Sequence, residues 1–257
     1  MLILDIFFNF RNKVYLSTLF IGIVKQVRIM CFSSTASFGA SAALAIIGVV
    51  SVVKAKTIPH RLFAAIPFIF SIQQFSEGML WLSIKHHDMA GMPAMTDTTT
   101  NHALFKTIFL AFALLVWPVY VPFTVWLLEK DKKRKKILSV FLAAGASVTL
   151  CLLYVMLTYP VQVMGERHHI HFEFALPKGG TKGVEWLISL FYFIATIAAP
   201  FISSVKRMKW LGVAFLLSYS IAIIFYSGFF VSVWCYFAAL LSIVVLWIVV
   251  GLRKNSN

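Results

Sequence analysis

Seven long apolar runs, separated by short polar segments, constrain the fold of this chain more than any other feature. The runs cover approximately Ser37–Val53, Leu62–Ile84, Leu104–Leu128, Ile137–Tyr159, Val184–Val205, Trp210–Phe229 and Val231–Val250. A bilayer core about 30 Å thick requires roughly 20 apolar residues per helix. The first run is short, but its flank from Phe32 to Phe38 can extend it. We therefore predict that each run crosses a membrane.

The pattern inside the runs indicates helices. Membrane β-strands alternate polar and apolar residues over about ten positions, and these runs do not alternate. Hydrophobic residues make up 60% of the chain and charged residues 12%, whereas a soluble domain has roughly 45–50% and about 25%. Lipid must therefore cover the outside. The predicted fold class is all-α integral membrane, a bundle of seven transmembrane helices forming one domain over residues 30–257.

Lysine and arginine alternate between the two sides of this bundle and predict its orientation. One set of connections carries Lys54, Lys56, Arg61, Lys130, Lys132, Lys133, Arg134, Lys135, Lys136, Lys206, Arg207, Lys209, Arg253 and Lys254. The other set has few basic residues, and acidic residues match them in number. Because cytoplasmic loops are enriched in Lys and Arg, we predict an amino end outside the cell and a cytoplasmic carboxyl end. The same clustering explains the net charge of +14 without a nucleic-acid partner.

The basic run Glu129–Lys136 has two interpretations. It can be a docking patch for anionic lipid or for an acidic partner. It can also be an ordinary cytoplasmic stop signal, which the enrichment of cytoplasmic loops in basic residues already predicts. We prefer the second interpretation.

Polar residues interrupt the second apolar run and form the first candidate site. Glu77 is the only acidic residue well inside any run, and Gln74 and Gln73 precede it by three and four positions, so both flank its face of a helix. Trp81 lies one turn further along. Ionisable groups inside a bilayer are costly and usually face the bundle interior. Such a group can bind a cation or an amine, carry a proton, or act as a base; otherwise it is a polar network that holds helices together.

The connection Gly165–Lys182, treated as a loop on the outer side, contains the second candidate site. In an extended chain, alternate residues share a face, so His169, His171 and Glu173 would point the same way. Two His and a carboxylate can hold zinc and leave a position open for water. The alternative is a His-rich solvent loop. Stoichiometric zinc in the purified protein, lost in the His169→Ala/His171→Ala variant, would support the metal site.

A family resemblance begins at Met30. The chain reads Met-Cys-Phe-Ser-Ser from there, and the second run contains Gln73-Gln74-Phe-Ser-Glu77-Gly78-Met-Leu-Trp81. This resembles a family of uncharacterised bacterial multi-pass membrane proteins that begin Met-Cys-Phe-Ser and carry Gln-Gln-x-x-Glu-Gly-x-x-Trp in the second helix. The resemblance implies a bacterial inner-membrane location and supplies no mechanism. It also predicts that Met1–Ile29 is dispensable or never made, which the intact mass of natively expressed protein tests.

Three functions are compatible with these features. The preferred hypothesis is a protein that binds or transports a small ligand, an ion or a proton, using Glu77 with Gln73 and Gln74. The second is a membrane-embedded, metal-dependent hydrolase or transferase with an outward-facing His/Glu site. The absence of a His from the interior of every run counts against this second hypothesis. The third is an accessory membrane subunit whose basic loops contact a partner.

Overall fold

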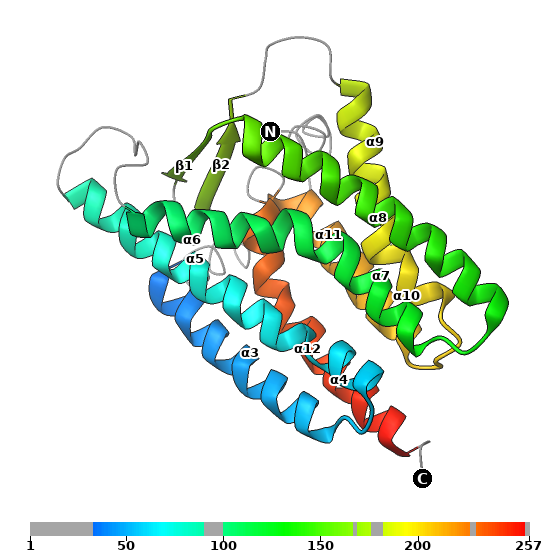
Figure 1. The fold of residues 1–257 in the computed structure, drawn as a ribbon. Coiled ribbons are helices and arrows are strands. Elements are labelled where there is room, and N and C mark those ends of the chain that lie inside the picture. The colour runs from blue at the N-terminus through cyan, green and yellow to red at the C-terminus, as the bar shows by residue number, and fades with distance from the viewer. Residues whose placement is uncertain (1–32, 90–99, 167–168, 176–181, 227–229, 255–257) are drawn as a thin grey trace, which may run out of the picture.

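The computed structural model describes residues 33–89, 100–166, 169–175, 182–226 and 230–254 (Figure 1). Within these residues the chain forms seven helical rods, as the apolar runs predict. In chain order they are α3 (Ser34–Lys54); α4 (Ile58–Ala64) with α5 (Ile66–Met89); α6 (Thr100–Leu110), η1 (Ala111–Val116) and α7 (Trp117–Leu128); α8 (Lys132–Thr158); α9 (Lys182–Phe193), η2 (Ile194–Ala198) and α10 (Ala199–Ile202); α11 (Met208–Tyr226); and α12 (Phe230–Lys254). The amino-terminal segment 1–29 lies outside the described residues.

Local sequence explains where several helices begin. Helix α8 begins five residues before its apolar run because Asp131 caps it, accepting a hydrogen bond from the Arg134 backbone N–H at 2.9 Å. In the same way, Ser33 caps α3 and accepts from the Ala36 N–H. A side-chain oxygen at this position satisfies one of the N–H groups that a helix leaves without a partner.

Prolines shape the third and fifth rods. A π-helical segment, η1 or η2, comes immediately before the turn that contains Pro118 or Pro200. Proline has no N–H, and its ring crowds the carbonyl four residues earlier, so the helix widens there. Side chains of other helices bond to carbonyls in η1, with Tyr192 Oη donating to Ala113 O at 2.8 Å and Thr149 Oγ1 to Leu115 O at 2.9 Å.

An antiparallel hairpin, β1 (Val161–Glu166) and β2 (His169–Phe174), is present in addition to the helices. Its second strand lies in Gly165–Lys182, which the sequence led us to expect as a loop. One face of the hairpin is buried, and its Phe172 stacks on Phe109 of α6 with ring centroids 5.1 Å apart. Burial of this face holds a short hairpin that would be marginal by itself.

Two apolar clusters form the interior. The larger contains residues of α3, α4, α5, α7, α8, η2, α10, α11 and α12, and the smaller joins α5, α6, η1, α8 and α9 to the hairpin. Helix α3 packs closely along α5. At Gly48 an added Cβ would lie 2.7 Å from the Phe68 backbone N, so a residue without a side chain permits this approach.

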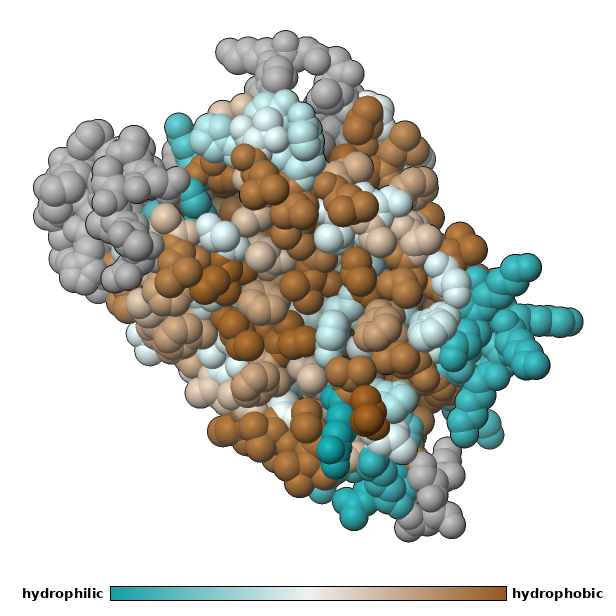
Figure 2. Space-filling view, viewed as in Figure 1, coloured by the Kyte–Doolittle hydropathy of each residue, from teal (hydrophilic) through white to brown (hydrophobic). Residues whose placement is uncertain are grey.

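The two ends of the molecule differ in polarity. The α7–α8 and α10–α11 connections and the carboxyl end of α12 lie at one end in Figure 1, and the hairpin lies at the other. Figure 2 shows hydrophilic side chains concentrated at the first end and a largely hydrophobic surface between the ends. Within the described part of the chain, three helical stretches are long and apolar enough to cross a membrane: Ser34–Lys54, His102–Leu128 and Lys132–Thr158.

Candidate functional site

A polar layer in α5 separates the two apolar clusters. Phe70 belongs to the larger cluster and Leu80 to the smaller, and Gln73, Gln74 and Glu77 lie between them in the sequence. Glu77 and Gln73 are each 1% exposed and Gln74 is 5% exposed. The polar layer is thus a buried group of two amides and a carboxyl, in the arrangement that their helical spacing predicts.

Hydrogen bonds fix both amides. Gln74 Nε2 donates to Glu77 Oε2 at 2.7 Å. Gln73 Oε1 accepts from the indole N–H of Trp117 at 2.7 Å, and the Trp117 ring stacks on Phe70 with centroids 3.9 Å apart. Trp117 follows directly after η1. The π-helical segment therefore immediately precedes the indole that reaches the polar layer, and such segments are common at functional sites.

Two polar atoms of this region have no hydrogen-bond partner among the described residues. They are Gln74 Oε1, an acceptor, and the N–H of Trp81, a donor. Trp81 is seven residues after Gln74 and four after Glu77, so the three share one helix face. Since buried polar groups nearly always have a partner, this face can accept a small polar ligand that carries both a donor and an acceptor.

Helix α6 contributes two buried polar residues, His102 just before the third apolar run and Lys106 near its start. His102 is 1% exposed and Lys106 is 8% exposed. Lys106 Nζ donates to Val161 O at 3.0 Å and thereby connects α6 to the first strand of the hairpin. His102, Lys106 and the fully buried Phe109 follow one another at helical spacing. That periodicity, starting two residues before the apolar run, is the signal that could have revealed them.

The hairpin places the predicted metal ligands on one face. β2 is extended, so His169, His171 and Glu173 alternate with the buried Ile170 and Phe172. The register also sets Glu166 directly opposite His169. The side chains of both histidines lie outside the described residues, and among the described side chains no three His, Cys, Asp or Glu come together. The zinc site stays a prediction.

Glu129 is a second buried carboxyl, 3% exposed, in the α7–α8 connection. Its oxygens accept four hydrogen bonds, from the Lys130 and Asp131 N–H groups at 2.9 Å and from the N–H and hydroxyl of Ser204 at 2.6 Å. Burial by itself would raise the pKa of Glu129, but these bonds outweigh it and lower the pKa. This carboxylate links the α7–α8 connection to the α10–α11 connection, so we assign it a structural role.

The fold and the polar layer together define a class: a mainly helical chain with several apolar helices and a buried carboxyl between two apolar clusters. The chain belongs to a family described as a family of unknown function (DUF6629), whose sequence profile matches residues 30–257. No curated protein and no solved structure gives a significant match.

Proposed function

We propose that this chain is a multi-pass membrane protein that binds a small cation, a protonated amine or a proton at the polar layer of α5. The observation that carries the proposal is the Glu77 carboxyl, 1% exposed and bonded to Gln74, on a helix face with an unpartnered amide oxygen and an unpartnered indole N–H. Transport and simple binding are both compatible with such a site.

The surface supports the membrane part of the proposal. Large apolar side chains are exposed on most of the helices, among them Val53 at 79%, Leu157 at 78%, and Ile46 and Leu150 at 66% each. Monomeric soluble proteins rarely expose contiguous apolar patches this extensive. The hydrophobic surface between the ends in Figure 2 is the region that lipid would cover.

The charge distribution supports the orientation. The α7–α8 and α10–α11 connections and the carboxyl end of α12, all of which carry exposed basic residues, lie at the same end (Figure 1). Enrichment in Lys and Arg marks the cytoplasmic side. We place this end in the cytoplasm and the hairpin outside.

The chemistry of the polar layer supports a cation. Carboxylate and amide oxygens are hard ligands that suit small cations. The donor of Trp81 adds a contact for an acceptor on the ligand. The indole of Trp117 holds Gln73 by a hydrogen bond, and this bond connects α7 to the polar layer.

The test uses the full chain in detergent micelles or lipid nanodiscs. Sodium, potassium, methylammonium and protons between pH 5 and 9 are the probes, and melting temperature and tryptophan fluorescence are the readouts. We expect at least one probe to shift the wild-type melting temperature by several degrees, and Glu77→Gln to abolish that shift. Trp81→Phe, which removes only the indole donor, should weaken it.

Asp131→Asn is the matched control because it removes an exposed carboxylate, and it should respond as the wild type does. Equal responses of wild type and Glu77→Gln to every probe would contradict the proposed site.

A further inference from the structure

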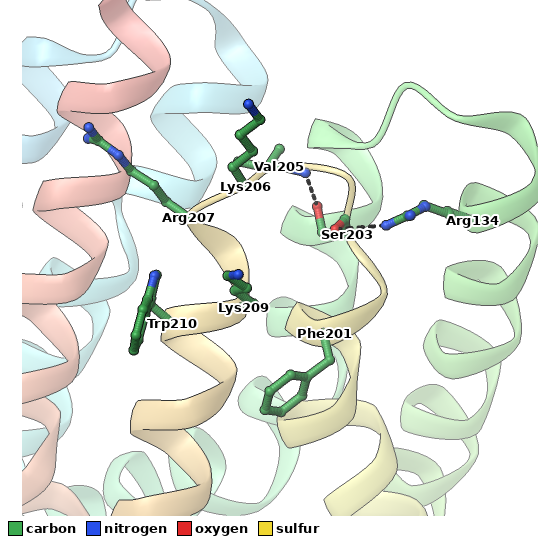
Figure 3. Close-up of a pocket in the computed structure, with 8 residues that line it drawn as sticks. All are labelled: Arg134, Phe201, Ser203, Val205, Lys206, Arg207, Lys209 and Trp210. Carbon is green, nitrogen blue, oxygen red and sulfur yellow. Dashed lines mark hydrogen bonds between the residues drawn. The ribbon is translucent and has the colours of Figure 1, made fainter.

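A pocket of about 610 Å³ lies between the start of α8, the α10–α11 connection and the first turn of α11 (Figure 3). Four of the residues that line it are basic: Arg134, Lys206, Arg207 and Lys209. No carboxylate is among the described residues that line it. We call it the basic pocket, and it lies at the end opposite the hairpin.

Glu129 and Asp131 are close to the basic pocket in the sequence or through their bonds, but neither lines it. Both oxygens of Glu129 are held by N–H and hydroxyl groups of the two connections, and Asp131 caps α8. Helix α11 has no acidic residue in its first turn, where the helix dipole adds positive potential. Four cations and a helix N-terminus therefore surround one pocket, an arrangement that an anion would stabilise.

Two guanidinium groups are fixed in place by the protein. Arg134 donates to the carbonyls of Ile202 and Ser203 at 3.1 Å each, and Figure 3 shows its side chain extending to Ser203. Arg207 donates to Trp247 O at 2.9 Å, and its Cζ lies 4.5 Å from the centroid of the Trp247 ring. Arg134 and Arg207 make these hydrogen bonds through Nη1, which leaves the other N–H donors of each guanidinium group available. Fixed guanidinium groups recognise phosphate well.

The rim of the pocket distinguishes a lipid from a soluble phosphate. Phe201 and Trp210 line it and are 41% and 53% exposed, and Trp247 beside Arg207 is 44% exposed. Aromatic side chains gather at the boundary between headgroups and hydrocarbon. On α11, Leu217 follows Trp210 by seven residues and is 58% exposed, so an exposed apolar face continues from the pocket along the helix.

We propose that the basic pocket binds the phosphate of an anionic phospholipid of the inner leaflet, with the acyl chains along the Trp210–Leu217 face of α11. The proposal rests on the membrane placement proposed above. Arg134 and Arg207 supply oriented donors, and Lys206 and Lys209 supply mobile positive charge. The basic run at the start of α8 thus contributes one residue to a built site and is more than a stop signal.

The test measures lipid retention on the full chain in a neutral detergent by native mass spectrometry, together with melting temperature. Phosphatidylglycerol is the probe, and phosphatidylcholine and inorganic phosphate are compared with it. We expect one phosphatidylglycerol per chain to be retained and to raise the melting temperature. Lys206→Gln/Lys209→Gln should weaken retention by about 30-fold, because both lysines line the pocket and each contributes a similar part of the free energy of binding to the lipid phosphate.

The matched control is Lys132→Gln/Lys133→Gln, which removes the same charge at the same end but outside the pocket. It should retain the lipid as the wild type does. Arg207→Lys, which keeps the charge and loses the planar fork, should weaken retention as well. Neither lysine of the pocket variant makes a hydrogen bond within the described structure, so that variant is expected to fold.

Three results would overturn the proposal. Equal losses in the pocket and control variants would mean unspecific attraction to the basic end. An equal effect of inorganic phosphate would make the ligand a soluble anion, and equal retention of phosphatidylcholine would remove the role of charge. Carbonate-resistant membrane association, measured in parallel, separates these failures from failure of the membrane placement itself.

Discussion

At the scale of single residues, the two buried carboxyls among the described side chains have different surroundings. Glu77 shares its helix face with the unpartnered Gln74 Oε1 and Trp81 N–H, whereas Glu129 accepts four hydrogen bonds from groups up to 75 residues away. Replacing Glu129 would leave several of those donors unsatisfied, at roughly 1–3 kcal/mol for a buried group. We expect Glu129→Gln to lower the melting temperature at pH 7, measured in detergent by intrinsic fluorescence.

The pH dependence of this effect follows from the lowered pKa of Glu129. A carboxyl whose pKa is lower in the folded state stabilises the fold above its unfolded value of about 4.3. That stabilisation is lost as the pH falls through the folded value. The difference between wild type and Glu129→Gln should therefore shrink below about pH 4. Asp131→Asn is the control with little effect, because Asn caps a helix about as well as Asp; equal destabilisation of the two variants would contradict the assigned role.

At the scale of elements, close approach of α3 to α5 depends on Gly48. An added Cβ there would lie within 2.9 Å of the Phe68 backbone N, Cα and Cβ, whereas at Gly39 of the same helix nothing lies within 4 Å. We expect Gly48→Ala to destabilise by about 1–3 kcal/mol, the usual cost of overpacking. Gly39→Ala should be neutral or stabilising, since Ala favours helix over Gly. Comparing the two melting temperatures checks this, and a Gly48→Ala protein as stable as Gly39→Ala would contradict the packing.

At the scale of the whole molecule, the distribution of basic residues predicts which end a membrane-impermeant maleimide can reach. Gln162 on β1 and Lys133 on α8 are both exposed and lie on opposite ends. In a background with Cys31, Cys151 and Cys235 replaced by serine, intact cells should label Gln162→Cys and leave Lys133→Cys unlabelled. Lysed cells should label both and provide the accessibility control. Labelling of Lys133→Cys on intact cells would reverse the proposed orientation.

Agreement between sequence and structure is greatest where the information is local. The apolar runs predict the seven rods because a continuous apolar stretch of about 20 residues without alternation forms a helix when it crosses lipid. The spacing of Gln74 and Glu77 predicts their contact, because residues three apart on a helix are neighbours. The hairpin is not predicted, because its strands are short and become ordered by packing on Phe109. The burial of His102 is not predicted, because α6 begins before its apolar run.

By itself, then, the sequence determined the number of helices, the position of the polar layer within the second rod and the separation of basic from acidic connections. These properties depend on residues close together in the chain, through helical periodicity and the cost of burying charge. Only the tertiary structure decided that Trp117 bonds to Gln73, that Glu129 bonds to Ser204 and that Arg134 lies in one pocket with Arg207. Each of these contacts joins distant segments, because the packing of helix faces and the π-helical segments before Pro118 and Pro200 set which side chains meet.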